Sequence, residues 1–191
     1  MRIVAGAFRG RALTAPRGQA TRPTADRTRE AVFNILEHAP WSPGLAGRRV
    51  MDLFAGSGAL GLEALSRGAA FCLFVETDEA ARGAIRQNIE ALGLFGVTRL
   101  HRRDATQLGP KPVGDGPAFD LAFLDPPYGK GLAEAALAAL AAGRWLTPGA
   151  LAVVERGGDE PALAAPGYSQ LDARDYGAAR VWFLRLEEAG A

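Results

Sequence analysis

The fold is decided by a stretch in the first third of the chain, Val50-Met51-Asp52-Leu53-Phe54-Ala55-Gly56-Ser57-Gly58-Ala59-Leu60-Gly61. An apolar run that includes an acid breaks into glycines before a second apolar run, which is typical of a strand, a tight turn and a helix. The three glycines let the backbone turn sharply, approach a ligand closely and pack the helix against the strand. Because the first N–H groups of such a helix face the turn, we expect a ligand there, although the same spacing occurs in structural turns without one.

The composition limits the class of protein. With 191 residues, 48% of them apolar, the chain can bury one α/β core and is short for two. No apolar run is long enough to span a bilayer, and arginines interrupt the N-terminus, so we expect a cytoplasmic protein with no membrane partner. Cys72, the single cysteine, lies in an apolar run and is expected to be a buried thiol. His38 and His101 have no ligand-spaced partners, so no metal site is expected.

Short apolar runs alternate with helical patterns from Arg49 onward. This alternation predicts right-handed βαβ units and a parallel sheet covered on both faces, with a ligand crevice at the carboxyl ends of the strands. Two later runs flank a turn and predict a C-terminal antiparallel hairpin. The expected fold is therefore α/β, a doubly wound, seven-stranded, mostly parallel and Rossmann-like sheet. After the opening strand, strands are expected at 71–76, 97–102, 118–125, 150–155, 168–174 and 180–186, and helices at 79–92 and 132–142.

The N-terminal part is basic. Residues 1–49 hold nine arginines and three acids, a charge of +6, so the remainder carries −5 of the total of +1. This asymmetry is a candidate footprint for phosphate, although solvated surface arginines would give the same count.

Two parts of the chain are expected from this pattern. A basic arm over residues 1–22 contains a small β-hairpin at 2–13 and the start of a loop, and the main domain covers 23–191. Thr24-Ala25-Asp26 offers a cap for an amphipathic helix at 27–37, which presents polar groups while its apolar face docks on the body.

Four acids fall at or just beyond the ends of successive strands, and their side chains are expected to converge on one rim of the sheet. Glu76 follows Gly56 by 20 residues, the spacing at which an acid meets ribose hydroxyls, and this leaves NAD open. Asp52 would repel a pyrophosphate, yet it suits the ammonium and sulfonium charges of S-adenosylmethionine. Taken singly, each acid can also cap the next helix. The four are Asp52, Glu76, Asp104 and Asp125.

The motif Asp125-Pro126-Pro127-Tyr128 decides between these cofactors. An exocyclic amine of a nucleobase is a poor nucleophile because its lone pair is delocalised into the ring. Asp125 can supply a carboxylate and Pro126 a carbonyl as acceptors that hold its hydrogens. The two prolines fix the turn without adding an N–H, and Tyr128 can stack on the base. A rigid turn with no catalytic role is the alternative.

Together these motifs resemble class I S-adenosylmethionine-dependent methyltransferases that act on amino groups of bases, and the N-terminal part is similar to the RsmD family of 16S ribosomal RNA guanine-N2 methyltransferases. The resemblance covers nearly the whole chain and is weakest over 109–117 and 156–175. It is carried by Arg2-Ile-Val-Ala-Gly6, Arg9-Gly-Arg-Ala-Leu13, residues 22–36, Asp52 to Gly61, Glu76-Thr77-Asp78, Asp104-Ala105 and Asp125 to Tyr128.

The resemblance implies S-adenosylmethionine as cofactor and a role for each motif. The glycine turn would wrap the methionine part with Asp52 near its ammonium, Glu76 would take the ribose, and Asp104 the adenine. The implied catalytic residues are Asp125, Pro126 and Tyr128. The implied cofactor-binding set is Asp52, Phe54, Ala55, Gly56, Ser57, Gly58, Glu76, Thr77, Asp104, Ala105 and Asp125.

The resemblance also implies a substrate, guanine 966 (standard 16S numbering) in the 16S rRNA of the small ribosomal subunit (30S) or its assembly intermediate. The enzyme is expected to act as a monomer. Five arginines are expected to contact RNA phosphates, namely Arg9, Arg11, Arg22, Arg27 and Arg29.

Two rival functions stay open at this point. The two acceptors and the aromatic ring would also serve an adenine-N6 methyltransferase acting on DNA or RNA. The other rival is a ribosome assembly factor that binds the cofactor and RNA without catalysing transfer.

Overall fold

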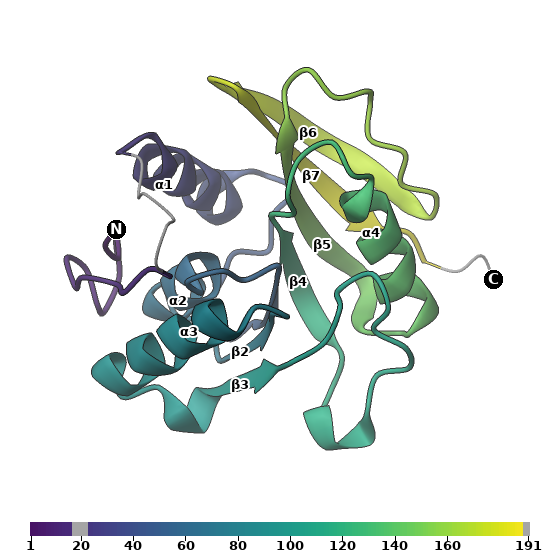
Figure 1. The fold of residues 1–191 in the computed structure, drawn as a ribbon. Helices are drawn as coiled ribbons and strands as arrows, with labels where there is room; N and C mark the ends of the chain where they lie inside the picture. Colours follow the sequence, from purple (N-terminus) through teal and green to yellow (C-terminus); the bar gives the residue numbers. More distant parts are fainter. Residues whose placement is uncertain (17–22, 189–191) are drawn as a thin grey trace.

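Strands and helices alternate along most of the chain in the computed structural model, which describes residues 1–16 and 23–188. Two short 3-10 turns, Phe95–Val97 and Val113–Asp115, precede β3 and β4. Figure 1 labels the main elements, which in order are α1 (Pro23–His38), β1 (Arg49–Leu53), α2 (Ala59–Ser66), β2 (Phe71–Val75), α3 (Glu79–Leu92), β3 (Thr98–His101), β4 (Phe119–Leu124), α4 (Leu132–Ala142), β5 (Leu146–Gly157), β6 (Tyr168–Tyr176) and β7 (Ala179–Leu186).

The strands form one seven-stranded sheet in the order β3-β2-β1-β4-β5-β7-β6. The first five in this order are parallel, and β7 runs antiparallel to both β5 and β6. The chain moves outward from β1 to β3 and then returns to β4 beside β1, so the order reverses between β1 and β4. In doubly wound sheets the ligand crevice lies at such a switch point. The expected fold class and its C-terminal hairpin are confirmed.

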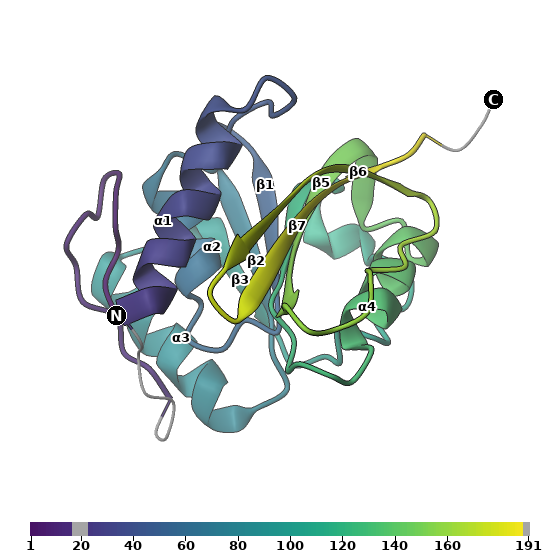
Figure 2. The same ribbon diagram turned by 90° about the horizontal axis from the view of Figure 1, so that it is seen from above.

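The alternation of side chains along each strand explains why helices cover both faces. Successive residues of a strand point to opposite faces, and here both sets are apolar, so each face needs a cover. Helices α1, α2 and α3 lie on one face and α4 on the other (Figures 1 and 2). In β2, Cys72 and Phe74 belong to the core under the three helices, whereas Leu73 and Val75 belong to the core under α4. The buried thiol expected for Cys72 is confirmed.

The N-terminal segment, residues 1–14, is fastened across α2 and α3 rather than forming a regular hairpin. An antiparallel bridge pairs Arg2 with Ala12, and three backbone hydrogen bonds join the two arms of the segment, from the N–H groups of Ile3, Gly10 and Leu13. Other N–H groups, including those of Val4, Phe8 and Thr14, donate to side chains of the body. Gly6 has a φ of 80° and lies so close to the Ser66 carbonyl that a Cβ would come within 1.9 Å of its oxygen. The expected hairpin is thus present in an irregular form, with one bridge, three hydrogen bonds between its arms and a close approach that only glycine permits.

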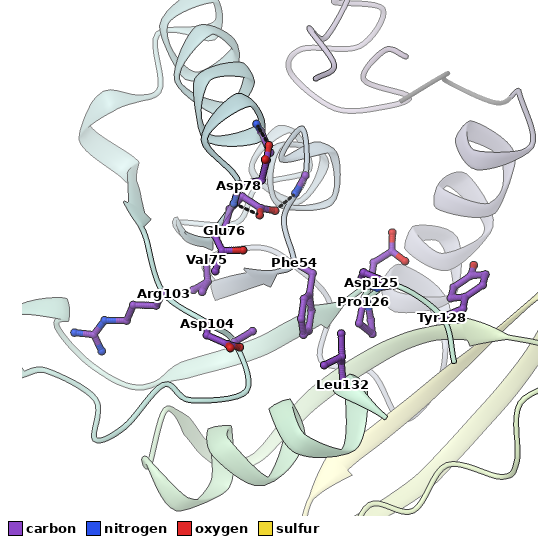
Figure 3. A pocket seen from close by; sticks show the side chains of 15 residues that line it. Phe54, Val75, Glu76, Asp78, Arg103, Asp104, Asp125, Pro126, Tyr128 and Leu132 are labelled. Atoms are coloured by element: carbon purple, nitrogen blue, oxygen red, sulfur yellow. Dashed lines mark hydrogen bonds between the residues drawn. The ribbon is translucent and has the colours of Figure 1, made fainter. Parts of the chain in front are cut away.

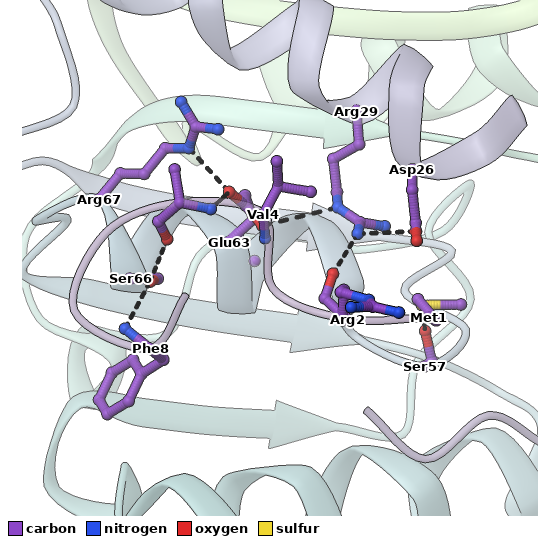
Figure 4. Close-up of polar contacts among 12 residues, drawn as sticks. Met1, Arg2, Val4, Phe8, Asp26, Arg29, Ser57, Glu63, Ser66 and Arg67 are labelled. Atoms are coloured by element: carbon purple, nitrogen blue, oxygen red, sulfur yellow. Dashed lines mark hydrogen bonds and ion pairs between the residues drawn. The ribbon is translucent and has the colours of Figure 1, made fainter. Parts of the chain in front are cut away.

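A buried ionic network holds this segment in place (Figure 4). Glu63 of α2 is fully buried and accepts hydrogen bonds from the backbone N–H groups of Val4 and Ala5, over 2.8 and 3.0 Å. Arg67 pairs with the same carboxylate over 2.8 Å, and Arg29 of α1 approaches it at 3.7 Å. Because α1 begins at Pro23 rather than at residue 27, Asp26 lies in its first turn and pairs with Arg29 instead of capping the helix.

Two further points complete the fold. Strand β5 is longer than the expected 150–155, because Leu146 already pairs with Phe119 of β4 before an irregularity in the register. Within the described residues, no helix combines the length and the apolar character that crossing a bilayer requires.

Candidate functional site

A cavity of about 890 Å³ opens at the carboxyl ends of the parallel strands (Figure 3). Its walls come from the segments that follow β1, β2, β3 and β4. Figure 3 shows Glu76 and Asp104 on one side, Asp125 and Tyr128 on the other, and Phe54 between them. Acids prevail in the lining: Glu76, Asp78, Asp104 and Asp125 all contribute, and Arg103 is the one basic residue among the described residues that line it.

The turn after β1 shapes the middle of this cavity. Phe54 has a φ of 58°, an unusual value for a bulky residue and of the kind found where a functional site constrains the backbone. The N–H of Gly56 donates to Glu76 Oε2 over 2.8 Å, which ties the turn to the end of β2. Phe54 and Gly56, both expected to bind the cofactor, line this cavity.

The other glycines of the turn serve packing. Gly58 is buried and lines neither this cavity nor its neighbour, because it faces Phe74 and Ile85. At Gly61, a Cβ would come within 2.5 Å of both Cys72 Sγ and Phe74 Cε1, so glycine is needed to seat α2 on β2. Gly58 therefore has a packing role, and its expected contact with the cofactor stays a prediction.

Asp52 lies beneath the turn rather than in the first cavity. Its side chain is 1% exposed, and its carboxylate accepts a hydrogen bond from the N–H of Gly61 over 2.9 Å. Burial raises the pKa of Asp52 well above its usual range, although the Gly61 hydrogen bond partly opposes this. Asp52 reaches the wall of a second cavity, described below, together with Ala55 and Ser57.

Two acids complete the far side of the first cavity. Glu76 accepts hydrogen bonds from both Gly56 and Asp78, so its carboxylate is fixed. Asp104 accepts from the N–H and the hydroxyl of Thr106 through one oxygen, Oδ1, and its side chain is exposed to the cavity. Thr77 and the buried Ala105 lie beside them, so all four residues expected on this side line the cavity.

Asp125 stands where two cavities meet. It directly follows β4, and its side chain is open to the first cavity and to a second one of about 530 Å³. The surrounding protein desolvates the carboxylate and the negative charge of Glu155 acts on it, so its pKa rises to about 7. Because water in the cavities also reaches this carboxylate, the shift will be largest when a bound ligand replaces that water.

The two prolines carry the chain from Asp125 to Tyr128, which also borders both cavities. The Tyr128 hydroxyl donates to Glu155 Oε1 over 2.6 Å, and burial together with this bond raises the pKa of the hydroxyl. Tyr128 nevertheless remains 46% exposed. Its aromatic ring is therefore held in place while part of it stays accessible.

The second cavity lies between α1, the turn after β1 and the β6–β7 turn. It shares Phe54, Gly56, Asp125 and Tyr128 with the first cavity. Its remaining wall is formed largely by Met1, Thr28, Arg29, Glu155, Tyr176 and Ala179. Two compartments that share one carboxylate, Asp125, and two aromatic side chains, Phe54 and Tyr128, can hold two reactants side by side.

The five arginines expected to bind RNA divide into three groups. Arg9, Arg11 and Arg27 are exposed. Arg22 lies outside the described residues. Arg29 is 5% exposed, and its guanidinium is engaged by Asp26, Glu63 and the Arg2 carbonyl, which argues against the expected contact with phosphate.

Two features of the site escaped the sequence analysis. Glu155 ends the expected strand 150–155, and the rule that selected the other strand-end acids would have found it. Arg156 is 6% exposed and joins Glu134 of α4 to Glu160 of the β5–β6 loop, over 3.1 and 3.0 Å. This second ionic cluster fastens the segment that follows Tyr128, and only the folded chain brings its members together.

Comparisons with known proteins agree on one family. The family model described as conserved hypothetical protein 95 matches residues 1–185. A Haemophilus influenzae protein named ribosomal RNA small subunit methyltransferase D is 35% identical over 177 residues, which cover 93% of this chain and 89% of that protein. The Escherichia coli K12 protein of the same name is 37% identical over 155 residues, covering 81% of this chain and 74% of that protein.

A solved structure described as a putative methyltransferase, yhhF, from Escherichia coli superposes with a TM-score of 0.82 at 34% identity, and the match covers 98% of both chains. The resemblance carried by the N-terminal motifs, the glycine turn and the Asp-Pro-Pro-Tyr motif is thereby confirmed. The chain belongs to the RsmD family.

Proposed function

We propose that this protein transfers a methyl group from S-adenosylmethionine to the exocyclic N2 amine of a guanine in 16S rRNA, nucleotide 966 in the standard numbering. The names of its relatives support an rRNA methyltransferase of the small subunit. The observation that carries the proposal is the junction of the two cavities at Asp125 and Tyr128. One cavity is suited to a methyl donor and the other to a base, and the proposed acceptors stand between them.

The lining of the first cavity fits S-adenosylmethionine better than a dinucleotide. Its lining has four acids and a single arginine, and this excess of negative charge would repel a pyrophosphate. Carboxylates suit hydroxyl groups and cationic centres instead. Glu76 would take the ribose hydroxyls, Asp104 and Ala105 would meet the adenine, and Gly56 would border the methionine part. When bound, the cofactor supplies a methyl group on a sulfonium, which is an activated donor.

Residues of the second cavity, together with Pro126 at the edge of the first, would hold the base. The Asp125 carboxylate and the Pro126 carbonyl accept the two hydrogens of the amine, which favours a pyramidal nitrogen with an available lone pair. The ring of Tyr128 stacks on the base and fixes its plane. When the N–CH₃ bond forms, one N–H bond breaks, and Asp125 with its raised pKa can take up that proton. Positioning and polarisation then supply most of the catalysis.

The exposed arginines suggest how RNA is held. Arg9 and Arg11 on the N-terminal segment and Arg27 on α1 would contact phosphates, and Arg22 belongs to the same basic arm. We further propose that the arm over 1–22 serves RNA binding, that the enzyme acts as a monomer in the cytoplasm, and that its substrate is the 30S subunit or an assembly intermediate.

The experiment is a transfer assay with labelled S-adenosylmethionine on three substrates: small subunits lacking the modification, free 16S rRNA and DNA. Digestion to nucleosides and mass spectrometry then identify the base. We expect one N2-methylguanine per small subunit. Label on adenine would support the adenine-N6 rival, and cofactor binding by calorimetry without any transfer would support the non-catalytic assembly factor.

A further inference from the structure

Glu155 is an acid in the second cavity to which the catalytic scheme above gives no role. It lies near the end of β5, pairs in register with Val181 of β7 and is partly exposed to the cavity. It lies close enough to act electrostatically on both Asp125 and Tyr128. Two carboxylates that face one cavity repel each other, so a ligand with hydrogen-bond donors would stabilise the pair.

The orientation of Glu155 is fixed by Tyr128. Its Oε1 accepts the Tyr128 hydroxyl over 2.6 Å. An ionised carboxylate has two oxygens and about four lone pairs, so it can accept further donors while it keeps this bond. The ring that would stack on the base thus also holds an acceptor at the edge of the space that the base would occupy.

The chemistry of the bases determines what such an acceptor would recognise. Guanine carries a hydrogen on N1 directly beside its N2 amine, so its edge presents a row of donors. Adenine has an unprotonated N1 beside its N6 amine, and a carboxylate placed there would meet a lone pair. Asp125 and the Pro126 carbonyl serve the amine of either base, and a third acceptor next to them serves only guanine.

We infer that Glu155 accepts the N1 hydrogen of the target guanine and thereby selects guanine over adenine. The inference rests on the proposed function, because it assumes that the second cavity receives the target base. In this scheme Glu155 touches the substrate and determines specificity, while Tyr128 both stacks on the base and orients Glu155.

The test uses 2-aminopurine, which keeps the amine at position 2 but has no hydrogen on N1. Small subunits are reconstituted with 16S rRNA that carries either guanine or 2-aminopurine at the target nucleotide, and kcat/KM is measured for both. The wild-type protein should prefer guanine by at least about 100-fold, because its carboxylate rejects the N1 lone pair. In Glu155→Gln the preference should fall below about tenfold, since the Gln amide can donate to that nitrogen.

Tyr128→Phe is the matched control, because it removes the hydrogen bond to Glu155 and keeps both the ring and the carboxylate. Because Glu155 then keeps its carboxylate but loses the bond that orients it, the preference of Tyr128→Phe for guanine should lie between those of the wild type and Glu155→Gln. If Glu155 only orients Tyr128, then Glu155→Gln and Tyr128→Phe will lower both substrates equally and leave the preference unchanged, which would overturn the inference.

The wild-type protein alone also decides the matter, even if Glu155→Gln fails to fold. Equal methylation of 2-aminopurine and guanine by the wild type would overturn the inference and leave the proposed function standing. Absence of any transfer to guanine N2 would overturn the proposed function itself, and the inference with it.

Discussion

Glu63 follows the glycine turn after β1, and Asp125 begins the Asp-Pro-Pro-Tyr turn after β4. The charge of one carboxylate is neutralised by its surroundings, and the charge of the other is not. Glu63 on α2 is fully buried and is neutralised by Arg67, Arg29 and two backbone N–H groups. Asp125 after β4 is open to two cavities, and the charge that acts on it is that of another acid, Glu155. A compensated charge fastens the chain to itself, whereas an uncompensated one is available to a ligand.

The largest effect on stability should come from the compensated acid. Glu63→Gln leaves two arginines buried beside a neutral group, so we expect a loss of about 3–5 kcal/mol in the free energy of unfolding. Denaturant unfolding measures it. Glu37→Gln is the control, because Glu37 pairs with the same Arg67 at the surface and should cost less than about 1 kcal/mol. Similar losses of stability in the two variants would show that the buried position of Glu63 has no special importance for the fold.

Asp125→Asn should show the reverse pattern. The amide keeps the shape but accepts with one oxygen only and cannot take up the proton, so kcat should fall by about 10²–10³-fold. The free energy of unfolding should not fall, because no ion pair is lost and a carboxylate whose charge the fold disfavours is removed. Single-turnover transfer and denaturant unfolding on one preparation test both statements. A stability loss as large as that of Glu63→Gln would assign Asp125 a structural role.

Tyr128→Ala should have a smaller effect that is confined to the base. Loss of stacking worth about 1–3 kcal/mol corresponds to a decrease of about 5- to 150-fold in kcat/KM for the RNA. Cofactor affinity measured by calorimetry should stay near normal. Equal losses of cofactor binding and transfer would remove the base-stacking role.

The smallest effects are expected at the exposed arginines. Each of Arg9→Ala, Arg11→Ala and Arg27→Ala should weaken RNA binding and lower the slope of log K against log salt by about one. Filter binding over a range of salt concentrations gives the slopes. An unchanged slope in the triple variant would show that these arginines do not contact RNA phosphates and only solvate the surface.

Most features that could be predicted from the sequence depend on patterns among residues close together in the chain. The alternation of strands and helices, the glycine turn and the Asp-Pro-Pro-Tyr motif depend on neighbours in sequence, and the parallel topology then gathers the strand ends. The position of Asp52 was also accessible, because it alternates with Met51 and Leu53, which face α4, so its carboxylate must point toward α2.

Other features depend on partners far apart in the chain. Arg29 resembles any exposed arginine of a basic helix until Glu63, 34 residues later, is found beneath it. The Arg156 cluster likewise joins α4 to the β5–β6 loop. The N-terminal segment has the pattern of a hairpin, but it forms an irregular one because side chains of α2 bind part of its backbone.

The most direct test of the central claim is the pH dependence of single-turnover transfer at saturating cofactor and RNA. Asp125 must be ionised to accept the amine hydrogens, and its pKa is raised to about 7 by desolvation and by Glu155. The other residues with ionisable side chains that line the second cavity are Asp52, Arg29, Tyr128 and Tyr176. The rate should therefore fall about tenfold per unit as the pH drops well below 7, and Glu155→Gln should move this fall to lower pH. A rate that stays constant from pH 5 to 9 would contradict the account.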